Sequence, residues 1–238
     1  MVELYTIPAG IPENLDRNRP AVIIDIFRAS TSITAALAAG AKEIHVAGSM
    51  EEAESLKNRL GQEVVMAGER EGFRIDGYDL GNSPYEMTPD NVSGRPVVFN
   101  STNGTRLMRR FQDFEHVVIG SLVSLSATVD YLGRFHSDPI LVCAGRLDFF
   151  SAEDALAAGI IISRLAMNED QMDDAACFAK RLVEISGDSW RQMARKSFHG
   201  RYLASIGLAA DLDFCLTVDK YSFLPIKTGE RLVRSDKL

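Results

Sequence analysis

Three features that are scarce or missing in this 238-residue chain limit the functions that it can have. The 26 Lys and Arg are outnumbered by 33 Asp and Glu, and the net charge of -7 disfavours a protein that neutralises a nucleic-acid backbone. The three cysteines include no Cys-x-x-Cys pair, so we expect reduced core residues in a cytoplasmic protein. The longest apolar runs, 33–41 and 155–162, are well short of the roughly 20 residues that span a bilayer, and residues 1–20 show no signal-peptide pattern. We therefore expect no nucleic-acid partner and no membrane partner.

The short motifs that would decide the chemistry are also missing. No two glycines stand two residues apart, which excludes the Gly-x-Gly-x-x-Gly dinucleotide fingerprint, and no Gly-Lys-Ser or Gly-Lys-Thr ends a phosphate loop. Gly-x-Ser-x-Gly and His-Glu-x-x-His are absent. Histidine-based zinc or Ser-His-Asp chemistry has no cluster to start from, because the four histidines are scattered: His45, His116, His136 and His199.

What the sequence does contain is the alternation of strands and helices typical of an α/β protein. The β-branched run 20–27 predicts a buried strand, and the Ala-rich segment 30–39, ended by Gly40, predicts a helix after it. Further strands are expected at 43–47, 62–67, 96–100, 116–120 and 139–144, with helices at 50–60, 104–111 and 122–132. After residue 170 the pattern is mostly helical, at 175–185, 188–196 and 199–206, before two short strands near 223–226 and 231–234.

The domain organisation has two interpretations. Strand 140–144, a polar loop and the helix beginning 155–159 echo strand 22–26, its loop and segment 36–40. This echo indicates either a duplicated half-domain or the chance likeness of Ala-rich helices that follow buried strands. We expect one domain over 1–238, with two lobes divided near 120–138 as the alternative.

Polar residues follow the first buried strand. Ligands bind outside the carboxyl ends of strands in open α/β sheets, which is where Asp25 and Arg28 fall. A carboxylate inside an apolar strand is costly unless it is paired or binds a metal, so Asp25 requires a partner. A salt bridge between Asp25 and Arg28 is the plain alternative to a functional site.

Two hydroxyl-rich segments also follow buried strands. Residues 28–32 read Arg-Ala-Ser-Thr-Ser, and residues 101–105 read Ser-Thr-Asn-Gly-Thr, where Gly104 allows a backbone to approach an anion closely. The alternative interpretation of the first segment is a helix cap, and that of the second segment is a plain turn.

Two further segments supply charges. The periodic pattern lapses over 68–91, and loops of that length are usually functional or mobile. Within it, Glu69 and Asp79 are oxygen ligands of the kind that Mg²⁺ prefers, and Arg70 offers bidentate geometry to a phosphate or sulfonate. The segment 145–154 places two adjacent carboxylates in the first turn of a helix, where the helix dipole favours them in any case.

These segments, in this order, resemble the 2-phosphosulfolactate phosphatase family. The similar stretches are VIIDIFRASTSITAALAAGA, GEREGFRIDGYDLGNSP, NSTNGT and CAGRLDFFSAEDALAAG, followed by HGRYLASIGLAADLDFCLTVD near the C-terminus. The resemblance implies a three-layer α/β/α sandwich with a mixed, largely parallel sheet. It also implies a Mg²⁺-dependent phosphatase that converts (2R)-phospho-3-sulfolactate to (2R)-3-sulfolactate and phosphate, in coenzyme M biosynthesis or in sulfolactate production.

The same resemblance gives roles to residues by position. It implies Mg²⁺ binding by Asp25, Glu69, Asp79 and Glu153, and catalysis by Asp25, Arg28, Glu69 and Asp154. The residues implied in substrate binding are Ser30, Thr31, Arg70, Asn82, Ser83, Thr102, Asn103, Gly104, Thr105 and Arg146. The aspartyl-phosphate scheme of haloacid-dehalogenase-type phosphatases is not supported, because Phe27 stands where their Asp-x-Asp motif needs its second Asp. Whether water or an Asp attacks phosphorus is left open by the sequence.

Other functions stay open at this point. The chain could be a phosphatase for another small phosphorylated acid or a sugar phosphate, or a non-catalytic protein that binds an anionic metabolite. Asp25 argues against simple binding, because a carboxylate among anion subsites repels the ligand unless a cation lies between them. The oligomeric state is undecided, with a homodimer as one alternative.

Overall fold

The computed structural model describes residues 1–147 and 149–237, except for the side chains of residues 105 and 106. Its strands are β1 (Glu3–Tyr5), β2 (Ala21–Ile24), β3 (Glu43–Val46), β4 (Val65–Arg70), β5 (Phe73–Arg74), β6 (Pro96–Asn100), β7 (Val117–Gly120), β8 (Ile140–Cys143), β9 (Pro225–Thr228) and β10 (Arg231–Arg234). Its helices are α1 (Ala29–Ala38), α2 (Met50–Leu60), α3 (Pro89–Val92), α4 (Gly104–Arg110), α5 (Leu125–Leu132), α6 (Ala152–Arg164), α7 (Asp174–Ser186), α8 (Trp190–Arg195), α9 (Phe198–Ser205) and α10 (Ala209–Cys215).

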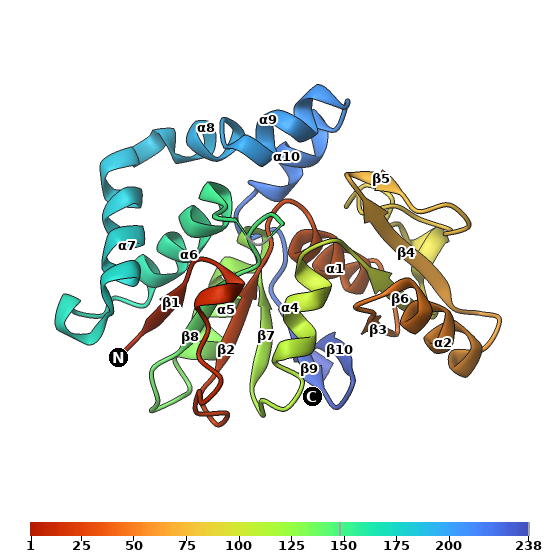
Figure 1. Ribbon diagram of the computed structural model, residues 1–238, viewed down its shortest axis with the longest axis horizontal. Coiled ribbons are helices and arrows are strands. Elements are labelled where there is room, and N and C mark those ends of the chain that lie inside the picture. Colours follow the sequence, from red (N-terminus) through yellow and green to blue (C-terminus); the bar gives the residue numbers. More distant parts are fainter. Residues whose placement is uncertain (148, 238) are drawn as a thin grey trace.

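The strands form one mixed sheet in the order β1-β8-β2-β7-β9-β10-β3-β6-β4-β5 (Figure 1). Two parallel groups, β1-β8-β2-β7 and β3-β6-β4, are joined by the antiparallel hairpin β9–β10. Strand β2 has a parallel neighbour on each side, with Ile24 opposite both Cys143 and Gly120. The predicted mixed, largely parallel sheet is confirmed.

Helices cover both faces of the sheet. The pleat of β2 sends Val22 and Ile24 into a core shared with α5 and α6, and Ala21 and Ile23 into a core shared with α1 and α4. Burial on both faces explains why the strand is apolar at every position instead of alternating. Helix α2 packs over a third, smaller cluster with β4 and β6. The expected three-layer α/β/α arrangement is confirmed.

Local signals placed some elements correctly. Helix α2 has the predicted bounds because Ser49 Oγ accepts a hydrogen bond from Glu52 N at 3.2 Å, and Gly61, with φ of 90°, ends the helix. Strands β1 and β5 and helices α3 and α10 were not predicted. Strand β1 has three residues and depends on pairing with β8, which no local pattern reports. The segment 68–91 is also more ordered than expected, because β4 continues to Arg70 and β5 pairs back against it.

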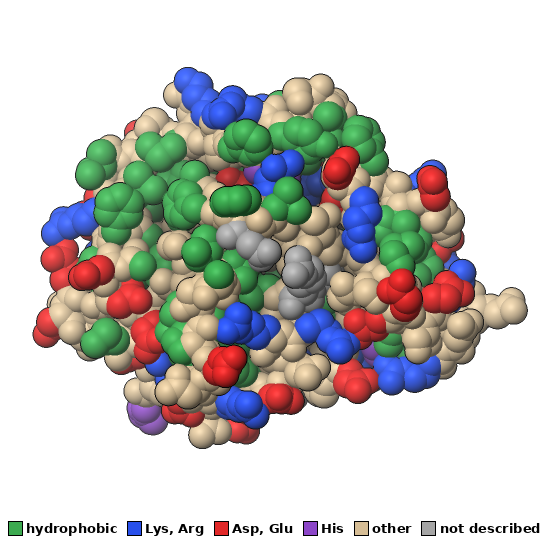
Figure 2. Space-filling model, viewed as in Figure 1, with side chains coloured by type: hydrophobic (Ala, Val, Ile, Leu, Met, Phe, Trp, Pro, Cys, Tyr) green, Lys and Arg blue, Asp and Glu red, His purple; other side chains and the backbone are tan. Residues whose placement is uncertain are grey.

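The last helices lie across one end of the sheet. In Figure 1, α8, α9 and α10 pass above the end at which β2 finishes and α1 begins. The face drawn in Figure 2 carries many hydrophobic side chains in its upper part and charges of both signs in its lower part. In the part of the chain that the structure describes, no helix combines the length and the apolarity needed to cross a membrane.

Candidate active site

A cavity of about 90 Å³ collects residues from segments far apart in the sequence. It is lined by Asp25, Phe27, Arg28, Glu69, Glu71, Gly72, Asn82, Thr102, Asn103, Arg146, Leu147, His199, Tyr202 and Leu203. Three successive strand pairings between the two parallel groups are antiparallel: β7 with β9, β9 with β10, and β10 with β3. Strands β4 and β6 are therefore antiparallel to β2. Twist accumulates from strand to strand, which lets the carboxyl ends of both groups reach one cavity.

Asp25 is buried at the end of β2 and has no ion pair within the described residues. Its N–H donates to Ser30 Oγ at 2.9 Å, and Gly104 lies so close that an added Cβ would be 2.7 Å from Asp25 Oδ2. Burial raises the pKa of Asp25 to about 6; His199 lowers it, and the nearby Glu69 raises it further. A buried acid without a cationic partner is the kind of group that marks a functional site.

Arg28 makes its ion pair with a different carboxylate from the expected one. Its guanidinium donates to Asp211 Oδ2 at 2.7 Å and to the backbone oxygen of Gly72 at 2.8 Å. Asp211, on α10, also accepts a hydrogen bond from Ser83 Oγ at 2.7 Å. The alternative prediction of a salt bridge between Asp25 and Arg28 is therefore wrong, and the charge of Arg28 is balanced by Asp211.

Glu69 is held at the end of β4 by backbone donors. Its Oε1 accepts from Thr102 N and its Oε2 accepts from Gly72 N, each at 2.8 Å. The neighbouring Arg70 donates to the backbone oxygen of Glu69 at 2.8 Å and does not line the cavity. Glu69 and Asp25 therefore face the same space from two strands.

Several polar groups in the cavity lack partners. Asn82 Oδ1 and Thr102 Oγ1 are buried without a hydrogen bond to any described residue. The guanidinium of Arg146 lies between two rings, 5.2 Å from the centroid of Phe198 and 5.0 Å from that of Tyr202. Asn103 Oδ1 accepts from Leu147 N at 3.0 Å. Arg146 makes no ion pair with the described residues, so it brings an uncompensated positive charge to the cavity.

Other predicted site residues form hydrogen bonds with the surrounding backbone. Asp154 accepts from Ile26 N at 2.9 Å and Gly145 N at 3.3 Å. Burial, then the charges of Glu153 and Asp25, raise the pKa of Asp154 well above its usual value. Thr31 Oγ1 donates to the oxygen of Ile26 at 3.2 Å, which fixes the loop after β2.

Two further predicted residues lie away from the cavity wall. Asp79 accepts from Met66 N at 2.8 Å, and Glu153 accepts from Ser151 Oγ and faces His199. Their roles as ligands stay predictions. The side chain of Thr105 lies outside the described part of the structure.

The prediction missed three residues at this site: His199, Tyr202 and Asp211. The scattered histidines were taken to offer no cluster, yet α9 brings His199 into a cavity with Asp25 and Glu69. All three missed residues belong to the C-terminal stretch 199–219, which supported the family resemblance without any role being given to its members. The similarity of that stretch to the family was therefore the sequence signal from which these residues could have been predicted.

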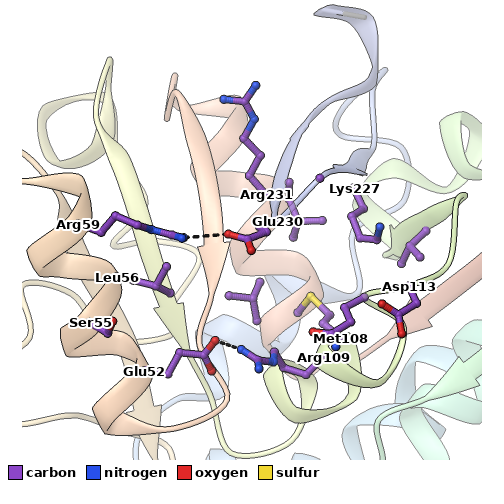
Figure 3. Close-up of a pocket in the computed structure, with 15 residues that line it drawn as sticks. Glu52, Ser55, Leu56, Arg59, Met108, Arg109, Asp113, Lys227, Glu230 and Arg231 are labelled. Atoms are coloured by element: carbon purple, nitrogen blue, oxygen red, sulfur yellow. Dashed lines mark hydrogen bonds and ion pairs between the residues drawn. The ribbon is translucent and has the colours of Figure 1, made fainter.

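A larger cavity of about 480 Å³ lies between α2, α4 and the β9–β10 hairpin (Figure 3). Two of its arginines are paired across it: Arg59 with Glu230 at 3.0 Å, and Arg109 with Glu52. None of the predicted site residues lines it. This groove is larger, but Arg59 and Arg109 have acidic partners in it and no predicted site residue lines it, so we place the site at the smaller cavity.

The fold and this cavity define an α/β protein in which carboxylates converge at strand ends with Arg146, an arginine that has no ion pair among the described residues. Comparison with known proteins then gives the family. A model of the family described as 2-phosphosulpholactate phosphatase matches residues 5–230, and the chain belongs to this family.

Individual relatives agree with the family match. A protein of Caldanaerobacter subterraneus subsp. tengcongensis is 35% identical over 90% of each chain, and one of Thermotoga petrophila is 38% identical over 87% of this chain and 88% of its own. One of Carboxydothermus hydrogenoformans is 33% identical over 95% of this chain and 96% of its own. All three carry the name "Probable 2-phosphosulfolactate phosphatase".

Proposed function

We propose that this chain hydrolyses the phosphate ester of (2R)-phospho-3-sulfolactate, with Mg²⁺ as its cofactor, and releases (2R)-3-sulfolactate and phosphate. The observation that carries the proposal is the family match over residues 5–230, together with the single cavity to which five segments of this chain contribute residues. The relatives named for this activity support the same assignment. The three cysteines are free, which is consistent with action in the reducing cytoplasm.

Asp25 and Glu69 are the residues that would hold the cation. Mg²⁺ is commonly bound through one or two carboxylates together with water and substrate phosphates. The described residues contain no group of three or more His, Cys, Asp or Glu able to hold an ion, so water and substrate oxygens would have to supply the remaining ligands. Asn82 Oδ1, buried without a partner in the same cavity, offers a further oxygen. Asp79 and Glu153 are not part of this proposal, because each accepts hydrogen bonds outside the cavity.

Asp25 and Glu69 would hold Mg²⁺ beside the substrate, where the cation would supply Lewis-acid stabilisation of the phosphate charge and favour deprotonation of the attacking water. The chain's own residues would orient the substrate. Arg146 would attract the sulfonate or carboxylate, since its charge has no carboxylate partner in the described structure. Thr102 Oγ1, which is buried without a partner, would donate to an anionic oxygen. Arg28 would hold the cavity wall, because Asp211 already balances its charge.

The curated relatives are named for a phosphatase that acts on a small phosphorylated acid, which favours this substrate class over sugar phosphates. Another small phosphorylated acid is therefore the second candidate substrate. A non-catalytic binding protein is disfavoured, because Asp25 and Glu69 would repel an anion without a cation between them.

Phosphate release from phosphosulfolactate, with Mg²⁺ and with EDTA, tests the proposal. We expect turnover with Mg²⁺, its loss in EDTA, and its recovery when Mg²⁺ is restored. A panel of small phospho-acids run beside it separates the two candidate substrates. If the chain released no phosphate from any of them under either condition, the enzymatic assignment would be wrong.

A further inference from the structure

His199 stands where the cavity meets a buried carboxylate. Ser197 Oγ accepts from Gly200 N at 3.0 Å and begins α9, while a Cβ at position 200 would lie 2.6 Å from the Arg195 oxygen. This tight turn from α8 to α9 fixes the position of His199. Its side chain is 16% exposed and lines the cavity, and its Nδ1 lies 3.2 Å from Oε1 of Glu153, which is 2% exposed.

The two ring nitrogens of His199 have different surroundings. Burial alone would raise the pKa of Glu153, but the hydrogen bond and charge of His199 bring it below its usual value, with help from Ser197. Glu153 Oε1 also accepts from Ser151 Oγ at 3.2 Å, so this buried carboxylate is an acceptor and we assign Nδ1–H of His199 as its second donor. Nε2 has no hydrogen-bond partner among the residues that the structure describes. A carboxylate that fixes one nitrogen and leaves the other toward a substrate is an arrangement suited to proton transfer.

The proposed reaction needs a proton donor. Breaking the phosphorus–oxygen bond of an alkyl phosphate leaves an alkoxide, which is a poor leaving group unless it is protonated. Arg28 and Arg146 do not give up protons at ordinary pH, and Tyr202 already donates its hydroxyl hydrogen to the oxygen of Glu71 at 2.9 Å. Asp25 and Glu69 are assigned to the cation in the proposed function. Of the other described residues that line the cavity, His199 is the one whose side chain type exchanges protons near neutral pH.

We propose that His199 is the general acid of this site and acts from its imidazolium form: as water attacks phosphorus and the ester bond breaks, Nε2 gives its proton to the leaving oxygen, while Nδ1 keeps the proton that it donates to Glu153. The electron pair of the broken bond stays on that oxygen, which becomes the hydroxyl of the product. The attacking water forms the new phosphorus–oxygen bond, and its released proton passes to solvent, from which His199 is protonated again. Glu153 is the positioning residue. This inference rests on the proposed function.

Charges from several segments face the ring. They are the acidic Asp25, Glu69, Glu71 and Glu153 and the basic Arg28 and Arg146. Because pH changes can act on several of these groups, the test compares leaving groups at one pH. An aryl phosphate such as p-nitrophenyl phosphate has a leaving group that departs without a proton, whereas phosphosulfolactate does not.

The key variant is His199→Gln, which cannot transfer a proton. General acid catalysis contributes about 10²- to 10⁴-fold, so kcat on phosphosulfolactate should fall by that amount. On p-nitrophenyl phosphate, the loss should be less than about 10-fold. Equal losses on both substrates, or no loss on either, would overturn the role of His199. A wild-type chain without activity on either substrate would instead reject the proposed function and this inference with it.

Three additional measurements separate proton donation from a structural effect. Glu153→Gln should lower kcat on phosphosulfolactate by about 10- to 100-fold, and much less on the aryl ester. Imidazole added to His199→Ala should restore part of the phosphosulfolactate activity alone. His116→Gln, at a half-buried histidine outside the cavity, is the matched control and should stay within about twofold on both substrates. A Glu153→Gln loss equal on both esters would make Glu153 merely structural and contradict its positioning role.

Discussion

The small cavity at the strand ends and the larger groove between α2, α4 and the hairpin differ in the state of their charges. In the groove, of about 480 Å³, Arg59 and Arg109 each face an acidic partner. In the cavity, of about 90 Å³, Asp25 is buried without an ion pair and Arg146 has none with any described residue. Uncompensated charges are costly to keep in a folded protein. Their concentration in the smaller space identifies it as the site more reliably than volume does.

Removing Arg28 should have the largest effect on stability. Its ion pair with Asp211 is buried, with side-chain exposures of 3% and 5%. Arg28→Met leaves Asp211 as an unpaired buried charge, which should lower the free energy of unfolding by about 3–5 kcal/mol in a denaturant titration. Arg28→Met with Asp211→Leu should recover much of that loss. A loss below about 1 kcal/mol in the single variant would show that Asp211 does not depend on Arg28.

Asp25→Asn should have the largest effect on catalysis. A carboxylate that holds a cation at the reacting phosphate supplies several kcal/mol, so kcat should fall by at least about 100-fold. The fold should survive, because the change replaces a buried acid whose ionisation is already disfavoured. Circular dichroism checks the fold and phosphate release checks the rate. Full activity in this variant would make Asp25 a structural residue.

The raised pKa of Asp25 also predicts how stability changes with pH. Its value is about 6 in the folded chain against 3.8 ordinarily, so the folded state binds more protons than the unfolded state between these values. The contribution to stability is present below pH 3.8 and is lost as pH rises through about 6. Wild type should therefore lose stability relative to Asp25→Asn over that range, as measured by denaturant titrations without Mg²⁺. A difference that is constant with pH would contradict the burial account.

Arg146→Gln should have an intermediate effect that appears in binding. Charge-assisted hydrogen bonds contribute about 1.5–3 kcal/mol, so KM for phosphosulfolactate should rise by about 10- to 100-fold. Stability should change by less than about 1 kcal/mol, because no ion pair with a described residue is broken and only the contacts with two rings are lost. An unchanged KM would remove Arg146 from the substrate site.

Arg59→Gln in the groove should have the smallest effect. Its pair with Glu230 is exposed, at 55% and 80% of the two side chains. Such pairs contribute about 0–1 kcal/mol, so both thermal stability and kcat/KM should be nearly unchanged. A clear loss of activity would mean that the groove takes part in function.

The sequence predicted the elements whose signals are local. Ser49 and Gly61 gave the bounds of α2, and the unbroken apolar run of β2 indicated burial on both faces. Asp25 was recognised because a charged residue in such a run must have a partner. Strand β1 could not be predicted in the same way, since its three residues become a strand through pairing with β8.

The site was harder to predict because its assembly depends on tertiary contacts. Asp211 joins Arg28 across 183 positions, and His199 meets Glu153 across 46. Ser30 and Thr31 lie in the first turn of α1 and Asp154 in the first turn of α6, but their hydrogen bonds go to backbone groups rather than into the cavity. Residue type and position after a strand predict which segments lie near the site. Tertiary packing then decides whether a given side chain faces the ligand or supports the backbone.

One assay tests the central claim, which is that the chemistry takes place at the small cavity. Phosphate release from phosphosulfolactate with Mg²⁺ should be measured for wild type, Asp25→Asn and Arg59→Gln under identical conditions. The account predicts a fall of at least about 100-fold for Asp25→Asn and a rate within about twofold of wild type for Arg59→Gln. An active Asp25→Asn enzyme beside an inactive Arg59→Gln enzyme would place the chemistry in the groove and contradict the account.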